Sequence, residues 1–425
     1  DKWTSLSYEP IFEEWWRADL AAMVLRDRNH PSVIIWSVGN EVERQGSPEM
    51  LDRLGMLADY CRELDPTRPV TCAFDPHNWP RSLFHGPIED KVKVMRKLAE
   101  KVDILALNYQ EQWYENYRQA IPDKLIVGSE SFPFFRGKGN ILKAFEPVNP
   151  WLDVEKHDYV VGQFVWPGID YLGETSWPYK GWNAGLMDTC GFRKPISYLQ
   201  ESFWSDKPMV HIAVFDDTVN HSIPSRWMAH WTWPKMTSSW TLPHCENQLV
   251  RLVTFTNCET VELIVNGESL GEKRLADFPD RLMTWYVPYA PGTIEAIGRM
   301  NGLICAVHRL QTAGEARRVV LTPDRSRMRA NGTDIAHVEV QIADESGILV
   351  PHAEIKVQFE LIGEGTIIGV DNGNLASSES YKGTCRTTYN GKCLVIVQAT
   401  EQPGTLELRA GAEGLTGDTV TLHTF

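Results

Sequence analysis

Positive charge is scarce in this 425-residue sequence, in which 42 lysines and arginines stand against 56 acidic residues and give a net charge of −14. Such a surface does not suit a phosphate backbone, so nucleic acid is excluded as a partner. Long apolar runs are missing as well, and none approaches the roughly 18 residues of a membrane-spanning helix. The first residues show no signal-peptide pattern. The sequence therefore predicts no membrane span, places any targeting segment outside the given chain, and leaves the compartment unknown, with a periplasmic or extracellular location slightly favoured over a cytoplasmic one.

Cysteine is sparse too. Eight cysteines are too few for a fold held together by disulfides, and none has the Cys-x-x-Cys or Cys/His spacing of a metal site, so no metal is predicted. Cys385 and Cys393 flank the hairpin signal Asn390-Gly391. Symmetric pairing about that turn places Cys393 opposite Thr388, which argues against a bridge.

Tryptophan, by contrast, is abundant. The chain has 16 tryptophans, most of them before residue 241, and several stand beside Asn, Asp, Glu or His. An aromatic ring with a polar neighbour suits a carbohydrate site as well as it suits an apolar core. The composition therefore admits a sugar-binding protein without requiring one.

The spacing of apolar residues divides the sequence into two parts, and it changes near residue 206. Before it, continuous apolar runs typical of buried parallel strands alternate with helix-period segments. The predicted strands are Val33–Val38, Val70–Phe74, Val102–Tyr109, Leu125–Gly128 and Val160–Trp166. Helices are predicted over Pro10–Arg26 and after Ser47, which caps a helix that Asp65-Pro66 ends. Strands separated by helices predict βαβ units and a parallel sheet.

After residue 206 the helical patterns vanish, and short strands follow one another with turn signals between them. Val261, Leu263 and Val265 alternate toward one face before the turn Asn266-Gly267. The segment 314–318 divides this part into two all-β blocks of about 100 residues, the size of an immunoglobulin-like sandwich. We therefore predict domains over residues 1–205, 206–313 and 314–425.

Two of the predicted strands end in a glutamate. Glu41 follows the strand that ends near Val38, and Glu130 follows the strand that ends at Gly128. Ionised carboxylates avoid such positions unless they are partnered. These glutamates could simply cap the next helices or pair with arginines such as Arg44 and Arg136. Two at matching positions favour a carboxylate pair, and glycoside hydrolysis is the chemistry that needs one.

A longer motif surrounds Glu41. Residues 26–41 read RDRNHPSVIIWSVGNE and closely resemble the acid/base signature of glycoside hydrolase family 2, the group of β-galactosidases, β-glucuronidases and β-mannosidases. Further matches follow in the family's order at Asn108-Tyr109, Ser129-Glu130, Phe164-Val165-Trp166, Gly185–Asp188 and Gly191–Pro195. The resemblance is strong over residues 1 to about 210, and the β-domains look like the C-terminal modules of many β-galactosidase-like members.

The resemblance implies a role for each matched residue. Glu41 would be the general acid/base and Glu130 the nucleophile of a retaining, two-glutamate mechanism, with carboxyl groups about 5–5.5 Å apart. Asn40 would donate a hydrogen bond to the sugar 2-hydroxyl, Tyr109 would hold the nucleophile, and Trp166 would form an apolar wall against the sugar ring. This chemistry requires no cofactor.

Taken one at a time, these residues have plainer interpretations. An asparagine after a strand can be a turn residue, and a single aromatic is often part of a core. His77 lies in a loop that follows another predicted strand, where it could reach the substrate or belong to a solvated loop. We keep His77 as a candidate substrate contact.

The choice of sugar depends on a segment before Gly185. Glucuronidases of the family hold the substrate carboxylate with an Asn-x-Lys pair there, whereas this sequence has Gly181-Trp182-Asn183-Ala184 and no lysine. The expected function is therefore hydrolysis of terminal β-galactosides. A β-mannosidase or β-glucuronidase of the same family is the alternative, and a non-catalytic carbohydrate-binding or adhesion protein is the alternative of another class.

The strand count fits only part of a barrel. A closed (β/α)₈ TIM barrel takes about 250 residues and eight strands. This chain has five predicted strands before the apolar spacing changes near residue 206. The resemblance implies a partial TIM barrel, strands 4–8, followed by two all-β immunoglobulin-like sandwich domains. We expect the missing N-terminal half of the barrel to come from the same longer polypeptide or from a companion chain. A homo-oligomer stays open.

Overall fold

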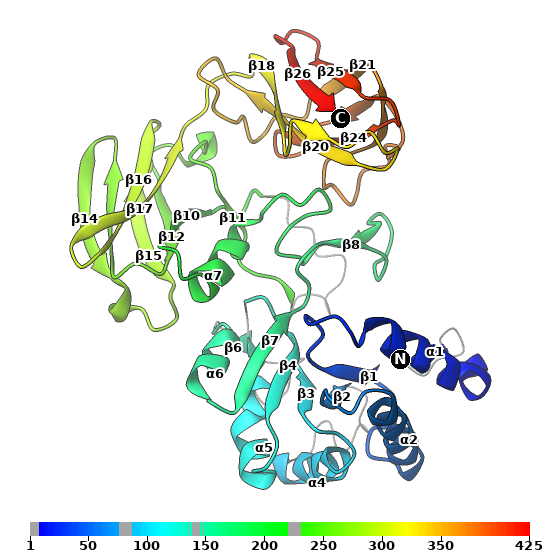
Figure 1. Ribbon diagram of the computed structural model, residues 1–425. Helices are drawn as coiled ribbons and strands as arrows, with labels where there is room; N and C mark the ends of the chain where they lie inside the picture. Colours follow the sequence, from blue (N-terminus) through cyan, green and yellow to red (C-terminus); the bar gives the residue numbers. More distant parts are fainter. Residues whose placement is uncertain (1–7, 76–86, 135, 138–144, 147, 220–230) are drawn as a thin grey trace. The chain divides into compact units, whose positions relative to one another are not determined.

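The computed structural model describes residues 8–75, 87–134, 136–137, 145–146, 148–219 and 231–425 (Figure 1). The chain divides into two compact units. The first holds the described residues of Asp1–Pro167 and Trp227–Trp233, and the second those of Gly168–Arg226 and Pro234–Phe425.

The first unit is built on a five-stranded parallel sheet with the order β1-β2-β3-β4-β7, whose strands lie side by side in Figure 1. Its strands are β1 (Trp36–Asn40), β2 (Val70–Phe74), β3 (Leu105–Asn108), β4 (Ile126–Ser131) and β7 (Val160–Val165). Helical segments alternate with these strands and are η1 (Glu9–Ile11), α1 (Phe12–Asp27), α2 (Pro48–Leu64), α4 (Ile88–Ala99), η3 (Glu111–Trp113), α5 (Tyr114–Ala120) and α6 (Trp151–Lys156). A short pair of strands, β5 (Arg136–Gly137) and β6 (Phe145–Glu146), precedes α6. The predicted βαβ alternation is confirmed.

Local sequence explains where these elements begin and end. The Ser47 hydroxyl accepts a hydrogen bond from the Met50 amide at 3.2 Å, and α2 ends before Asp65, as the sequence predicts. The predicted start of the first strand at Val33 is wrong, because the register with β2 begins at Trp36 and Val70. A strand needs a hydrogen-bonded partner. In this register the residues opposite 33–35 come before β2 begins, so 33–35 have no strand to pair with.

The core of this unit lies between the sheet and its helices. It joins apolar side chains from the strands to others on α2, α4 and α5, including Phe74, Leu107, Met50, Met95 and Tyr117. In the described part of the chain, no helix is long and apolar enough to cross a membrane.

The second unit begins with the hairpin β8 (Tyr171–Leu172) and β9 (Gly181–Trp182), followed by α7 (Pro195–Trp204). Four sheets follow, with the orders β11-β10-β12-β15, β14-β13-β16-β17, β18-β20-β24-β22 and β19-β26-β25-β21-β23. The elements of the first two sheets are β10 (Val210–Phe215), β11 (Met236–Thr237), η5 (Pro243–Cys245), β12 (Leu249–Thr256), β13 (Thr260–Val265), β14 (Glu268–Arg274), η6 (Leu275–Asp277), β15 (Met283–Pro288), β16 (Thr293–Met300) and β17 (Leu303–Gln311). Those of the last two are β18 (Arg318–Pro323), β19 (Arg327–Met328), β20 (Ile335–Ala343), β21 (Lys356–Ile362), β22 (Gly365–Asp371), β23 (Cys385–Thr387), β24 (Lys392–Ala399), β25 (Gly404–Gly411) and β26 (Asp418–Thr424).

Each pair of sheets encloses one apolar core, which makes each pair a β-sandwich. Strands of both sheets contribute to the core of the first pair, as do strands of both sheets to that of the second. Strand β20 shows the reason, because Ala336, Val338, Val340 and Ile342 alternate along it and all four are fully buried. The prediction of all-β sandwich structure after residue 206 is confirmed.

Candidate active site

The carboxyl ends of the parallel strands carry most of the residues that the sequence singles out. Asn40 is the last residue of β1 and Glu41 follows it, while Glu130 is the last residue but one of β4. Tyr109 directly follows β3, and Trp166 directly follows β7. Because neighbouring parallel strands end at the same edge of a sheet, these side chains belong to one edge.

Asn108, the last residue of β3, joins Asn40 to Glu41. Its side-chain nitrogen Nδ2 donates to Asn40 Oδ1 at 3.1 Å and to Glu41 Oε1 at 3.0 Å. Its oxygen Oδ1 accepts from the Ser129 hydroxyl at 2.6 Å, which fixes the orientation of the amide. Asn108 is fully buried and Glu41 is nearly so. The Asn108 amide therefore positions the Glu41 carboxylate, and it is itself held by Ser129, the residue before Glu130.

Tyr109 holds the second carboxylate. Its hydroxyl donates to Glu130 Oε2 at 2.7 Å and accepts from Trp231 Nε1 at 2.9 Å. The ring stacks on Phe132 with a centroid separation of 4.4 Å and meets Trp231 edge to face at 5.4 Å. The aromatic contacts and the indole donor fix the direction in which the Tyr109 hydroxyl points.

Both glutamates affect the pKa of the Tyr109 hydroxyl. Burial raises the pKa of Tyr109 well above 10, and the negative charges of Glu130 and, more weakly, Glu41 raise it further. Tyr109 is therefore protonated at neutral pH, and its hydroxyl acts as a donor toward Glu130. Donation to a carboxylate favours its ionised form, which is the form a nucleophile needs.

The backbone is unusual at two of these residues. Glu41 has φ = 50° and Tyr109 has φ = 55°, in the left-handed region that side chains other than glycine seldom adopt. The Glu41 amide donates to Ala73 O at 3.0 Å, and the Tyr109 amide donates to Glu130 O at 2.8 Å. These bonds to neighbouring strands stabilise conformations that are otherwise costly. Strain of this kind is concentrated at functional sites.

The other candidates occupy less connected positions. The Trp166 amide donates to Ser131 O at 3.0 Å, which ties the residue after β7 to the end of β4. The Trp166 side chain is half-buried. His77 lies outside the described residues, so its role stays a prediction.

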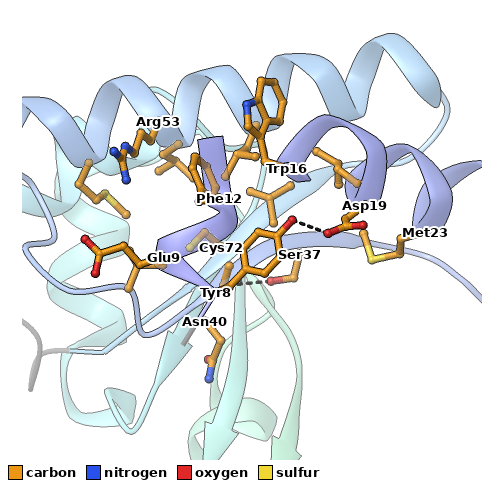
Figure 2. A pocket seen from close by; sticks show the side chains of 17 residues that line it. Tyr8, Glu9, Phe12, Trp16, Asp19, Met23, Ser37, Asn40, Arg53 and Cys72 are labelled. Atoms are coloured by element: carbon orange, nitrogen blue, oxygen red, sulfur yellow. Dashed lines mark hydrogen bonds between the residues drawn. The ribbon is translucent and has the colours of Figure 1, made fainter. Parts of the chain in front are cut away.

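A cavity of about 480 Å³ lies beside β1, between that strand and helices α1 and α2 (Figure 2). Its lining is mainly apolar, with polar groups such as Glu9 and Asp19, and Tyr8 donates a hydrogen bond to Asp19. Asn40 belongs to the lining, but in Figure 2 its side chain points away from Phe12 and Trp16. Neither Glu41 nor Glu130 lines this cavity. The cavity therefore reaches Asn40, at the end of β1, but neither of the two glutamates.

Two residues of this arrangement were not predicted as site residues. Asn108 appeared only as part of a motif, although its position at the end of an apolar strand was a usable signal. Trp231 lies 122 positions after Tyr109, in a tryptophan-rich stretch whose composition alone pointed toward it. Within the described ranges, no group of three or more His, Cys, Asp and Glu side chains is arranged to hold a metal ion.

Comparisons with known families match three parts of the chain. Residues 1–127 match the family described as glycosyl hydrolases family 2, TIM barrel domain, and residues 319–421 match glycoside hydrolase family 2 C-terminal domain 5. Residues 247–306 match a domain of unknown function. The matched barrel segment contains β1, β2 and β3 with Asn40, Glu41 and Tyr109.

Individual relatives extend the likeness over almost the whole chain. A protein of Bacteroides ovatus named β-galactosidase BoGH2A is 31% identical over 97% of this chain and 52% of its own length. A putative β-glucuronidase of Formosa agariphila is 27% identical over 92% of this chain and 38% of its own length. A crystal structure of a glycosyl hydrolase family 2 member from Bacteroides cellulosilyticus is 30% identical, has a TM-score of 0.88, and is matched over 100% of this chain and 54% of that one. The chain thus spans about half the length, or less, of these relatives.

Proposed function

Since this chain belongs to glycoside hydrolase family 2, as its barrel and C-terminal matches show, we propose that it carries the catalytic pair of a retaining β-glycosidase. Glu41 is the general acid/base and Glu130 is the nucleophile. The observation that carries the proposal is the hydrogen-bond arrangement at the strand ends, in which Asn108 holds Glu41 and Tyr109 holds Glu130. Each carboxylate has its own partner, as two carboxylates with different roles require.

The reaction proceeds in two displacements. Glu41 first gives its proton to the glycosidic oxygen while Glu130 attacks the anomeric carbon, so that the aglycone leaves and a covalent glycosyl-enzyme forms. Glu41, now ionised, then takes a proton from a water molecule that attacks the same carbon and releases Glu130. The sugar leaves with its anomeric configuration retained, and both glutamates regain their starting states.

The neighbouring residues prepare this step. The Asn40 side-chain oxygen accepts from Asn108, which orients the amide so that its NH₂ group is the end available to a sugar hydroxyl. A hydrogen bond from Asn40 to the 2-hydroxyl would strengthen as the oxocarbenium-like transition state forms. Trp166 supplies an apolar wall for the C–H face of the sugar ring.

We propose a β-galactoside as substrate. The B. ovatus relative is named a β-galactosidase, and the Asn-x-Lys pair expected of a glucuronidase is absent from residues 181–184. Lys194 does not take its place, because its ammonium donates to both oxygens of Asp170 and to Asn183 O, each at 2.7 Å. A β-mannosidase or β-glucuronidase is the alternative, and relatives named as β-glucuronidases support the latter.

The catalytic sheet needs further strands to become a barrel. Among the described residues β1 and β7 form the two edges of the sheet, and the mainly apolar cavity lies against β1. We propose that the five strands correspond to strands 4–8 of a TIM barrel and that the remaining strands come from the same longer polypeptide or from a companion chain. The two sandwiches are proposed to be immunoglobulin-like.

The test uses the full-length protein and a panel of nitrophenyl β-glycosides. We expect the β-galactoside to be cleaved fastest, with the anomer of the first product, read by NMR, retained. Glu130→Gln should lower kcat on the order of 10⁴-fold, whereas Glu115→Gln, on an exposed position of α5, should leave it unchanged. Equal rates for Glu130→Gln and the unmodified protein would refute the catalytic assignment and favour a carbohydrate-binding protein. An inverted product would refute the retaining mechanism.

A further inference from the structure

Two thiols face each other inside the first β-sandwich. Cys258 lies in the turn between β12 and β13, Cys305 lies in β17, and their sulfur atoms are 3.5 Å apart. Both are free cysteines, 47 positions apart in the sequence. The Cys258 side chain is fully buried, and that of Cys305 is half-buried. Neither residue belongs to the proposed catalytic machinery.

A β-bulge brings Cys305 into this position. Gly298 of β16 pairs with Ala306 and Arg299 pairs with Ile304, so Cys305 is the extra residue of β17. In a regular strand, consecutive side chains point to opposite faces. Here Cys305 and Ala306 are both half-buried while Ile304 is exposed, because the bulge turns two neighbours to the same side.

A glycine makes room for the other sulfur. A Cβ atom at Gly298 would lie 2.6 Å from Cys258 Sγ, which is closer than real contacts allow. The Cys258 thiol also lies 3.4 Å from Met209 O as a donor, and the Cys305 thiol lies 3.5 Å from Gly298 O. A bulge, a glycine and two carbonyl acceptors thus converge on one pair of sulfur atoms.

We propose that Cys258 and Cys305 form a disulfide when the folded protein meets a small-molecule or protein disulfide as oxidant. A disulfide has an S–S distance of about 2.05 Å, so the two sulfur atoms must approach by about 1.5 Å from their separation of 3.5 Å. Rotation about the Cα–Cβ bonds moves the sulfur atoms without moving the strands. The turn that carries Cys258 and the strand that carries Cys305 therefore already hold the two thiols close together for oxidation.

The exchange proceeds through a mixed disulfide. Cys305, the more accessible thiol, attacks the oxidant as a thiolate, forms one S–S bond and releases one thiol. Cys258 then loses its proton and attacks the Cys305 sulfur, which forms the internal bond and releases the second thiol. Two electrons and two protons pass from the cysteines to the oxidant. Burial raises the pKa of the Cys258 thiol, so this second step should accelerate as the pH rises.

The Cys258–Cys305 disulfide would stabilise the connection between α7 and β10. Asn257, next to Cys258, accepts from the Met209 amide at 2.8 Å and donates to the Ser205 and Lys207 carbonyls, both at 2.8 Å. These contacts fix the segment that leads from α7 into β10. Cross-linking Cys258 to β17 would therefore secure the turn that holds this segment.

The test treats the full-length protein with glutathione disulfide at mildly alkaline pH and maps its peptides by mass spectrometry under non-reducing conditions. We expect one peptide pair joined through Cys258 and Cys305. Closing a loop of this length should lower the unfolding equilibrium constant of the sandwich roughly a thousandfold, seen as a higher urea midpoint that a reductant reverses. Cys305→Ser should abolish the linked pair, and Cys385→Ser, a half-buried cysteine of β23, should keep it.

Two results would overturn the proposal. One is a protein in which Cys305 carries glutathione while Cys258 stays a thiol after prolonged oxidation. The other is a cross-link that joins either cysteine to a different residue. Both come from the unmodified sequence, so they do not depend on whether a variant folds.

Discussion

Removing the hydroxyl of Tyr109 tests the proposed nucleophile most directly. Tyr109→Phe deletes the donor that lies 2.7 Å from Glu130 Oε2 and leaves the ring stacking in place. A hydrogen bond to a charged group contributes about 1.5–3 kcal/mol. At about 1.4 kcal/mol for each factor of ten, kcat should fall roughly 10- to 150-fold if the full value is lost in the transition state. KM should change much less, because the hydroxyl contacts the nucleophile and not the substrate.

The matched control removes the same atom from another buried ring. Tyr114 is fully buried, and within the described part of the chain its hydroxyl has no hydrogen-bond partner. Tyr114→Phe should therefore leave kcat unchanged and stability equal or slightly higher. Both variants are assayed on nitrophenyl β-galactoside in the full-length protein, with thermal unfolding followed in parallel.

The pH dependence sharpens the test. Because burial keeps the pKa of Tyr109 well above 10, the hydroxyl is protonated throughout the range in which a glycosidase works. The activity ratio between Tyr109→Phe and the unmodified protein should therefore be constant from about pH 7 to 9, the range in which loss of the Tyr109 proton would otherwise show. A kcat that falls equally in Tyr109→Phe and Tyr114→Phe, or that falls only in proportion to unfolded protein, would refute the reasoning.

Three further predictions concern stability in the second unit. Burial raises the pKa of Asp188 from 3.8 to about 7, so the folded chain keeps a proton that the unfolded chain releases. The resulting stabilisation, at most about 4 kcal/mol, is present below about pH 4 and lost as the pH rises through 7. Asp188→Asn, whose side-chain oxygen can still accept from the two backbone amides that Asp188 Oδ1 serves, should flatten this decline in urea titrations; an unchanged slope would contradict it. Gly298→Ala should cost about 1–3 kcal/mol, since its new Cβ would lie 2.6 Å from Cys258 Sγ, and adding Cys258→Ala should recover part of that loss; purely additive losses would exclude the clash. Arg386, fully buried, donates to Asp371 at 3.0 Å, so Arg386→Met should cost about 3–5 kcal/mol because a carboxylate is left without its cation; a midpoint shift near zero in the same titration would show that the carboxylate finds another partner.

Sequence reasoning located the sheet because its strands are continuous apolar runs. The prediction for Val70–Phe74 matches β2, a central strand buried along its whole length. The prediction for β1 starts three residues early, because Val33, Ile34 and Ile35 are as apolar as a strand while Ile34 is 67% exposed. At an edge strand, pairing and not composition sets the boundary, and pairing is a property of two segments.

The candidate site shows the same limit. The positions of Glu41 and Glu130 at the ends of apolar strands could be predicted, although β4 extends past Glu130 to Ser131 and not only to Gly128. The Asn108 bridge depends on the register of three strands, and the Trp231 contact depends on a segment 122 positions away from Tyr109. Neither can be derived from spacing along one stretch of chain. His77 and the sugar specificity stay predictions.

The indole of Trp231 makes the unit with the candidate active site discontinuous in sequence. Trp231–Trp233 belong to the unit that contains the parallel sheet, although the strand β10 of the first sandwich precedes them in the chain. A protein cut after residue 205 would keep both glutamates and every strand of that sheet, yet it would lose the donor that fixes the Tyr109 hydroxyl. On the proposed role of Tyr109, a cut at residue 205 would therefore weaken catalysis although it spares both glutamates.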